Sequence, residues 1–163
     1  MLTDSLIETA ELVLSRARGR GLKIATVESC TGGLVAGTLT AVAGSSDVVD
    51  RGFVTYSNEA KTEMVGVPAA LIEAEGAVSR PVAEAMATGG IARSRADLAV
   101  SITGIAGPGG ATPTKPVGLV YLACARRGGT VTHRRHAFPG DRQAVRAQSV
   151  AVALDMLLDA LAD

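Results

Sequence analysis

The sequence has no tryptophan and few aromatic residues of any kind, which limits how the protein can bind and pack. Among its 163 residues, the aromatic ones are only Phe53, Tyr56, Tyr121 and Phe138. Four aromatic side chains are too few for the stacking platform on which proteins bind single-stranded nucleic acid. The hydrophobic core must therefore consist mainly of Ala, Val, Leu and Ile, since 47% of the residues are hydrophobic.

The chain also lacks an excess of charge of either sign. Lys and Arg number 16 and Asp and Glu number 16, so the formal net charge is zero. This balance excludes a nucleic-acid binder that works by bulk positive charge, but it leaves room for a small local anion site. A composition with 20% charged residues is that of a globular protein. The length fits a single domain over residues 1–163.

Cysteine and histidine are equally scarce. Cys30 and Cys124 form no C-x-x-C pair, and the two histidines are His133 and His136. This set lacks the spacing of a structural zinc site, so we predict no structural metal ion. Two cysteines do not make a disulfide scaffold, and the N-terminal residues 1–20 carry acids among their apolar residues, unlike a signal peptide or a membrane span. We therefore expect a cytoplasmic protein.

Apolar periodicity indicates helices that alternate with strands. The patterns predict helices at about 5–18, 31–42, 58–65, 68–76, 80–93 and 142–161, and strands at 22–27, 52–56, 97–103, 117–125 and 130–138. The last two strands are joined at Arg127-Gly128-Gly129, a hairpin signal that predicts an antiparallel pair. The sequence thus predicts an α/β fold, a three-layer α/β/α sandwich with a mixed sheet.

The first candidate site lies in the segment TVESCTGG at 26–33, where a predicted strand gives way to a helix. Ligands of open α/β sheets bind beyond the C-terminal ends of strands, and the free N–H groups of a helix start favour negative charge. Ser29 at this bend could be a nucleophile, with neighbouring N–H groups as an oxyanion hole. The alternative is that Ser29 or Thr31 only caps the helix, which is the more common use of such residues.

The second candidate is the segment YSNEAK at 56–61. Lys61 falls in the first turn of a predicted helix, where the helix dipole lowers the pKa of a lysine, and such a lysine can act as a general base. Tyr56, at the end of the preceding strand, would face the same cleft. The alternative, which is more frequent in proteins generally, is a solvated lysine beside a half-buried tyrosine.

The third candidate is TGIAGPGG at 103–110, which opens a long Gly/Pro loop after a buried strand. It is neither a Walker A loop nor a dinucleotide fingerprint, because the Gly-Lys-Ser/Thr and G-x-G-x-x-G patterns are missing. Its backbone N–H groups could bind an anion or a carbonyl oxygen. An ordinary flexible connection is the alternative, although long loops in compact domains are often functional.

The fourth candidate is the start of the last predicted helix, where Arg142 and Arg146 lie four residues apart on one face. A cation at a helix start is unfavourable unless an anion is bound there, so a phosphate held by Arg142 and the helix N–H groups would explain it. A surface salt bridge to Asp141 or to a neighbouring subunit is the alternative.

Six segments taken together resemble the CinA C-terminal family. These segments are ESCTGG at 28–33, AGSS at 43–46, TYSNEAK at 55–61, GAVS at 76–79, TGIAGPGG at 103–110 and KPVG at 115–118. Their order and spacing match over nearly the whole chain. The family includes stand-alone nicotinamide-nucleotide amidases and the C-terminal part of a larger competence/damage-inducible protein. Because that protein's N-terminal nucleotide-processing domain has no counterpart here, the chain resembles a stand-alone amidase.

The resemblance implies hydrolysis of the carboxamide of nicotinamide mononucleotide (NMN) to nicotinate mononucleotide and ammonia, with no cofactor. The catalytic serine, tyrosine and lysine of the family match Ser29, Tyr56 and Lys61. In this reading Ser29 attacks the carboxamide carbon, and neutral Lys61 takes its proton directly or through Tyr56.

Substrate contacts are expected from both glycine-rich segments and from the last helix. The N–H groups within 30–33, or those within 104–105, would hold the oxyanion. The candidate ligands of the 5′-phosphate are Thr31, Thr103, Gly104 and Arg142. The full set of predicted substrate contacts is Cys30, Thr31, Gly32, Gly33, Thr103, Gly104, Ile105 and Arg142.

The expected partners are the small-molecule substrate and a second copy of the chain, since Ala-rich helix faces can be buried in a dimer. Neither nucleic acid nor a membrane is expected. One rival interpretation is a non-catalytic CinA-type module that binds a partner or a nucleotide in the competence or damage response. Another is an amidohydrolase of different specificity on the same Ser/Lys framework.

Overall fold

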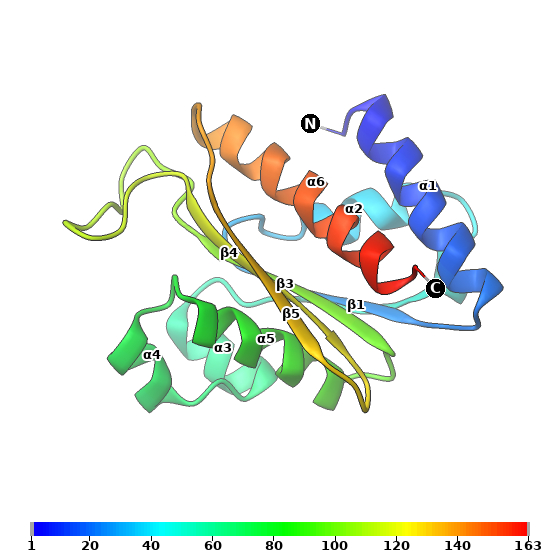
Figure 1. Cartoon of the computed structure of the whole chain (residues 1–163), viewed down its shortest axis with the longest axis horizontal. Helices are drawn as coiled ribbons and strands as arrows, with labels where there is room; N and C mark the ends of the chain where they lie inside the picture. Colours follow the sequence, from blue (N-terminus) through cyan, green and yellow to red (C-terminus); the bar gives the residue numbers. More distant parts are fainter. Residues whose placement is uncertain (1, 163) are drawn as a thin grey trace.

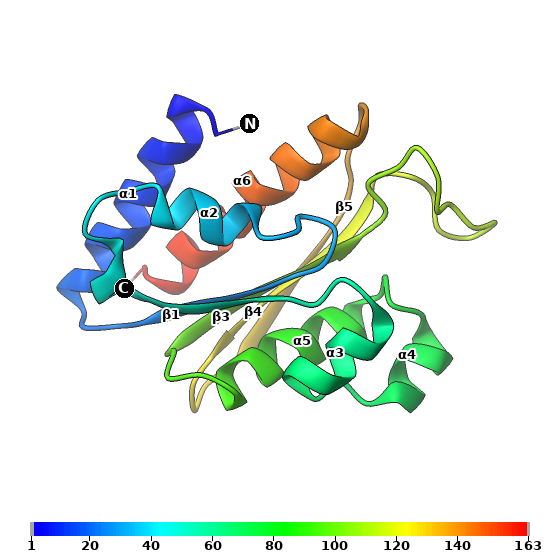
Figure 2. The same ribbon diagram turned by 180° about the vertical axis from the view of Figure 1, so that it is seen from behind.

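The computed structural model of the chain describes residues 2–162, which fold into three layers (Figure 1). The middle layer is a five-stranded sheet made of β1 (Ile24–Glu28), β2 (Val49–Val54), β3 (Leu98–Gly104), β4 (Leu119–Arg126) and β5 (Val131–Ala137). One face of the sheet is covered by α1 (Asp4–Gly19), α2 (Leu34–Thr40) and α6 (Arg142–Ala160). The other face is covered by α3 (Asn58–Val65), α4 (Ala69–Glu75) and α5 (Arg80–Ala92) (Figure 2). The predicted α/β/α sandwich is confirmed.

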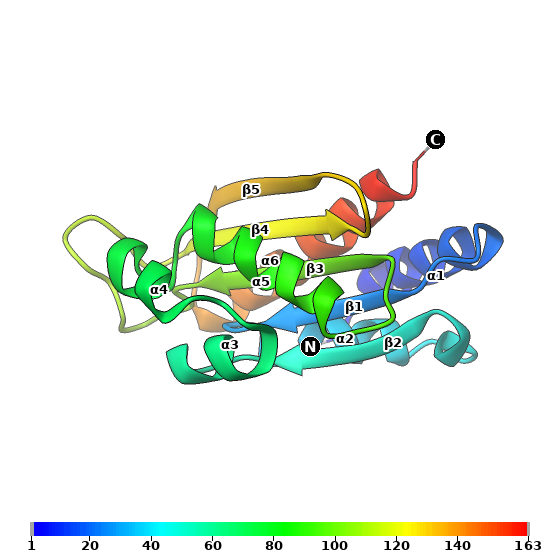
Figure 3. The same ribbon diagram turned by 90° about the horizontal axis from the view of Figure 1, so that it is seen from below.

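The sheet brings the predicted motifs to one edge. Its strand order is β2-β1-β3-β4-β5, with β1 parallel to both β2 and β3, and with β4 antiparallel to both β3 and β5. The mixed sheet and its terminal hairpin are therefore as predicted. Because β1, β2 and β3 are parallel, their carboxyl ends share one edge of the sheet (Figure 3). The three segments that follow these strands, which begin at Ser29, Thr55 and Ile105, must meet at that edge.

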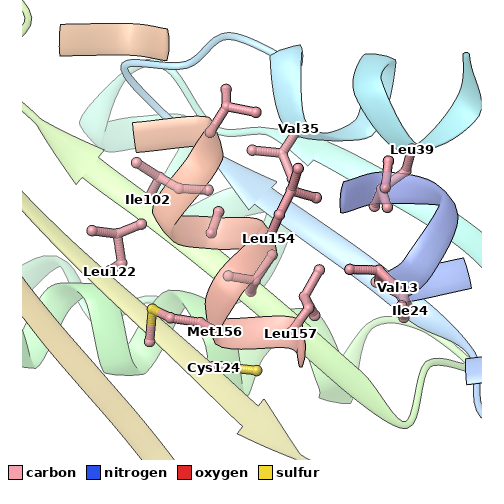
Figure 4. Packing of buried hydrophobic residues seen from close by; sticks show 14 of the residues in the cluster. Val13, Ile24, Val35, Leu39, Ile102, Leu122, Cys124, Leu154, Met156 and Leu157 are labelled. Atoms are coloured by element: carbon pink, nitrogen blue, oxygen red, sulfur yellow. The ribbon is translucent and has the colours of Figure 1, made fainter. Parts of the chain in front are cut away.

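The largest part of the hydrophobic core lies between the sheet and the layer of α1, α2 and α6. Figure 4 shows Leu154 and Leu157 of α6 packed among side chains of the sheet, α1 and α2, all of them fully or almost fully buried. Burial of each such leucine contributes about 1.5–3 kcal/mol to folding. This packing fixes α6 on the sheet and so determines where its N-terminal turn lies.

The opposite layer is built with much smaller side chains. Ala83 and Ala87 of α5 pack on Ala123 and Ala125 of β4, and all four are buried. Small residues let α5 approach its neighbours closely, most of all at Gly89. A Cβ atom at that position would lie 1.8 Å from the Val65 carbonyl oxygen at the end of α3.

Substitution of Gly89 is expected to separate α5 from α3. Alanine improves helix propensity by up to ~1 kcal/mol, but at Gly89 the new methyl group would collide with backbone that cannot rotate away. We expect Gly89→Ala to lower the free energy of unfolding by about 1–3 kcal/mol, as overpacking does, and urea unfolding measures this. Gly37→Ala is the matched control, because a Cβ atom at Gly37 in α2 would have no neighbour within 4 Å. An equal change in the free energy of unfolding for Gly89→Ala and Gly37→Ala would show that the close approach of α5 to α3 does not require glycine at position 89.

Two predicted elements begin three residues away from where the structure places them, and the other boundaries differ by at most two residues. The strand predicted at 52–56 runs from Val49 to Val54, and the helix predicted at 31–42 begins only at Leu34. None of the helices in residues 2–162 is both long enough and apolar enough to cross a membrane.

Candidate active site

The segment that carries Ser29 is a turn and not the first turn of a helix. Residues 29–33 lie between β1 and α2, and they include Gly32 and Gly33 with φ angles of 57° and 102°. This left-handed region is open to glycine at little cost, so the two glycines delay the helix to Leu34. The residue that caps α2 is Gly33, without a side-chain hydrogen bond. The alternative that Ser29 or Thr31 serves as the cap is therefore wrong.

The anion at the start of α2 comes from the protein itself. The carboxylate of Glu28, which is fully buried, accepts hydrogen bonds from the N–H groups of Val35 (2.9 Å) and Ala36 (3.0 Å) and from the Thr31 hydroxyl (2.6 Å). The helix N–H groups are thus not available to a ligand, contrary to the prediction. Thr31 is fully buried and bonded to Glu28, so its side chain does not contact the substrate site. The sequence analysis missed Glu28, although an acidic residue just before a helix start was a usable signal.

Lys61 comes from α3 and meets Ser29 across the edge of the sheet. Its Nζ lies 3.1 Å from the Ser29 Oγ and donates to the Thr55 carbonyl at 3.1 Å. Only 1% of Lys61 is exposed, so the alternative of a solvated surface lysine is wrong. A nucleophile within hydrogen-bond distance of a base is the arrangement that activates a serine hydroxyl.

The surroundings of the pair favour an uncharged amine. Burial lowers the pKa of the Lys61 amine below its ordinary value of 10.5, because the charged form loses its hydration. Among residues 2–162, Lys61 forms no ion pair with a carboxylate. Burial also raises the pKa of the neighbouring Cys30 thiol to about 11, so this thiol is neutral at neutral pH and is a weak nucleophile.

The pair opens into a cavity of about 270 Å³. The predicted site residues that line it are Ser29, Cys30, Tyr56, Lys61, Thr103, Gly104, Ile105 and Arg142. The predicted contacts Thr31, Gly32 and Gly33 do not line it, because they form the back of the turn. The sequence analysis missed Asn58 at the start of α3, and also Ala77 and Val78 between α4 and α5.

Two of the N–H groups predicted to hold an oxyanion are used within the fold. The N–H of Ile105 donates to the Leu119 carbonyl, and that of Gly32 donates to the Ser29 carbonyl. Because hydrogen bonds alternate along an antiparallel pair, the N–H of Gly104 points away from β4 and toward the end of β1. The N–H groups of Cys30 and Gly104 remain as candidate donors on the Ser29 side of the cavity.

Arg142 crosses the mouth of the cavity. Its guanidinium donates to the Gly107 carbonyl (2.9 Å) and to the Tyr56 hydroxyl (3.1 Å), so it connects α6 to the Gly/Pro loop and to the segment after β2. The alternative of a salt bridge from Arg142 to Asp141 is not formed; the Asp141 carboxylate instead caps α6 by accepting from the Ala144 N–H (2.9 Å). Tyr56 lies beyond the end of β2, lines the cavity and is 60% exposed, so it is more exposed than the half-buried tyrosine of the alternative interpretation.

The Thr103 side chain is engaged within the fold. The Thr103 hydroxyl donates to the Ala77 carbonyl at 2.8 Å, so this proton is not free for a phosphate oxygen. Among residues 2–162, no group of three or more His, Cys, Asp or Glu side chains is placed to hold a metal ion.

Known proteins with similar sequences fall in one family. The sequence profile of the CinA C-terminal domain matches residues 6–161. The nicotinamide-nucleotide amidohydrolase PncC of Escherichia coli is 51% identical over 96% of this chain and 95% of its own length. A CinA-like protein of Mycolicibacterium vanbaalenii is 57% identical over 86% of this chain, but the match spans only 33% of that longer protein.

Solved structures agree with this assignment. The competence/damage-inducible protein CihA of Agrobacterium tumefaciens is 49% identical and superposes with a TM-score of 0.95, covering 99% of this chain and 98% of that one. A CinA-superfamily protein of E. coli is 34% identical, with a TM-score of 0.92 over 98% of this chain and 94% of that one. On the sequence profile, the relatives and the fold, this chain belongs to the CinA C-terminal domain family.

Proposed function

We propose that this protein is an amidase that hydrolyses the carboxamide of NMN to nicotinate mononucleotide and ammonia. The observation that carries the proposal is the 3.1 Å separation of the Ser29 Oγ from the Nζ of the buried Lys61 at the wall of a cavity. An amide is a poor electrophile, so it needs an activated nucleophile and a stabilised oxyanion. The name of the E. coli relative supports the choice of NMN among amides.

In the proposed reaction, neutral Lys61 removes the Ser29 proton while the Oγ attacks the carboxamide carbon. The oxyanion of the tetrahedral intermediate is held by the N–H groups of Cys30 and Gly104. The C–N bond then breaks, the Lys61 proton goes to the departing nitrogen, and ammonia leaves an ester of nicotinate mononucleotide on the Ser29 Oγ. Lys61 next removes a proton from water, whose oxygen attacks the ester carbon. The C–Oγ bond then breaks, the proton passes from Lys61 to the Ser29 Oγ, and nicotinate mononucleotide leaves. The short Ser29–Lys61 distance supports direct proton transfer, whereas Tyr56 is bonded to Arg142.

Recognition of the phosphate is assigned to the N-terminal turn of α6. A second cavity of about 770 Å³ adjoins the first and shares Ala106 and Arg142 with it. A substrate whose pyridine ring lies beside Ser29 would extend its ribose phosphate toward this second cavity. We propose that Arg142 then leaves its bonds to Tyr56 and Gly107 and binds the 5′-phosphate.

Arg142→Ala is therefore expected to raise the KM for NMN about 10- to 100-fold while kcat changes little, because a charged hydrogen bond made equally in substrate and transition state is lost. Steady-state kinetics of ammonia release measure this. Arg135→Ala, at an exposed arginine of β5, controls for the loss of one positive charge. A loss of kcat at unchanged KM would contradict the phosphate assignment.

The function itself is tested by ammonia release from NMN, nicotinamide and NAD by the purified protein. Release from NMN alone is the expected result. Release from another amide but not from NMN would indicate a different specificity on the same Ser/Lys framework. Folded protein that releases ammonia from none of them would favour the non-catalytic module that binds a partner or a nucleotide.

Two further expectations accompany the proposal. A phosphorylated substrate does not cross a lipid bilayer unaided, so we propose that the enzyme acts in the cytoplasm. We also propose a homodimer, for which light scattering of the purified chain is the direct test, and a monomer at micromolar concentration would contradict it.

A further inference from the structure

The turn that carries Ser29 is held from two sides by charged side chains. On one side, Arg146 of α6 donates from its Nε to the Cys30 carbonyl (3.1 Å) and from its NH2 group to the Thr31 carbonyl (3.4 Å). On the other side, the buried Glu28 carboxylate accepts from the Thr31 hydroxyl and from the first N–H groups of α2. The nucleophile therefore sits in a turn that is bonded to two different helices.

The backbone bonds of the turn, from the Gly32 N–H to the Ser29 carbonyl and from the Leu34 N–H to the Thr31 carbonyl, leave the Cys30 carbonyl to be held by Arg146. Gly32 and Gly33 have left-handed conformations, and glycine moves readily between backbone conformations. The partner of the nucleophile, Lys61, lies on a separate element, so the 3.1 Å distance to the Ser29 Oγ depends on how firmly the turn is anchored. A displacement of ~1 Å between reacting groups can lower a rate about 10²-fold.

We propose that Arg146 is a positioning residue for Ser29: by holding the carbonyls of Cys30 and Thr31, it fixes the turn so that the Ser29 Oγ faces Lys61. A guanidinium suits this task, because it presents several N–H donors in one rigid plane and can bond two successive carbonyl oxygens. The inference rests on the proposed function only for the choice of substrate.

A competing role must be separated from this one. Arg146 also lines the second cavity, to which the substrate phosphate is assigned. A phosphate ligand would raise KM for phosphorylated substrates only, whereas a positioning residue lowers kcat for every substrate at nearly constant KM. Nicotinamide riboside, which is NMN without its phosphate, distinguishes the two roles.

The experiment compares Arg146→Ala and Arg146→Lys with the wild type on NMN and on nicotinamide riboside. For Arg146→Ala we expect kcat to fall about 10²-fold at unchanged KM, by the same factor on both substrates. The kcat of Arg146→Lys should fall less than that of Arg146→Ala, because the lysine amine can still reach one of the two carbonyl oxygens. Added guanidinium ion should partly restore Arg146→Ala by taking the place of the lost side chain. Arg135→Ala is the matched control for loss of an arginine elsewhere.

A second measurement does not depend on NMN as substrate. A fluorophosphonate probe labels activated serines, so its rate of reaction with Ser29 reports the geometry of the nucleophile directly. We expect labelling to slow in Arg146→Ala as kcat does, and thermal unfolding identifies any variant that is not folded, in which case Arg146→Lys carries the test. If the wild type is labelled but does not hydrolyse NMN, the proposed substrate is wrong and the labelling rates still decide the role of Arg146.

Three results would overturn the inference. The first is a rise in KM confined to NMN, which would make Arg146 a phosphate ligand. The second is an unchanged labelling rate in folded Arg146→Ala, which would show that the turn keeps its geometry without the arginine. The third is a wild-type protein whose Ser29 does not react with the probe at all, since a serine fixed against Lys61 is a reactive nucleophile.

Discussion

Ser29→Ala is expected to abolish ammonia release from NMN, with a loss in kcat of at least about 10⁴-fold. The physical reason is that no other group at the cavity can replace the Oγ: the thiol of Cys30 is neutral because burial raises its pKa to about 11, and the Lys61 amine is needed as the base. The measurement is ammonia release by wild type and variant side by side, at a protein concentration that makes a 10⁴-fold loss detectable.

Two controls make this result interpretable. The Ser29 side chain donates no hydrogen bond that holds the fold together, so the thermal unfolding temperature of Ser29→Ala should stay close to that of the wild type. Ser46→Ala, at an exposed serine in the short helix before β2 that does not line the cavity, should keep full activity. Equal ammonia release by wild type and Ser29→Ala would mean that the nucleophile lies elsewhere or that a contaminating amidase is being measured.

Lys61→Met is expected to lower kcat about 10²- to 10⁴-fold, the contribution typical of a general base, while the protein stays folded. Methionine has a similar length and suits a buried position, so it removes the amine with little change in packing. Lys61→Arg should have a kcat as low as that of Lys61→Met, because a guanidinium stays protonated and cannot accept the Ser29 proton. A Lys61→Met variant that keeps wild-type kcat would exclude this residue as the base.

The pH dependence of wild-type activity gives an independent check on Lys61. Burial lowers the pKa of Lys61, and only the neutral amine can accept a proton, so kcat/KM should rise with pH through a pKa below 10.5. The free energy of unfolding should rise with pH over the same window, from the lowered folded pKa to about 10.5, because the unfolded chain binds more protons there. Both slopes should be absent in Lys61→Met, and a flat wild-type activity profile from about pH 6 to 10 would contradict the general-base role.

The arrangement of layers was predictable because it follows from local signals. Apolar periodicity distinguishes helices from strands within a few residues, and the Arg127-Gly128-Gly129 turn identifies the antiparallel hairpin. The shift of the second strand to Val49–Val54 was not predictable in this way, since edge strands are only partly buried and their apolar pattern is weak.

The site was predictable in its residue types but not in its contacts. The sequence identified Ser29, Lys61 and Arg142, yet it favoured a solvated lysine, because the contact that holds the buried amine against Ser29 joins residues 32 positions apart in the chain. Glu28 was not predicted either, although it is an acidic residue just before a helix start; its carboxylate accepts the N–H groups of Val35 and Ala36. The Ser29–Lys61 contact, by contrast, joins distant segments and leaves no periodic trace in the sequence.

The order of the site residues along the chain has a consequence for evolvability. The proposed nucleophile and its base lie within residues 28–61, in the turn after β1 and on α3, whereas the other walls of the cavity come from 77–78, 103–110 and α6. The segments 105–117 and 138–143 thus line the two cavities without containing Ser29, Lys61, Gly104 or Arg146. Random libraries confined to 105–117 and 138–143 should therefore yield amidases with new substrate preferences while the Ser29–Lys61 pair is left untouched.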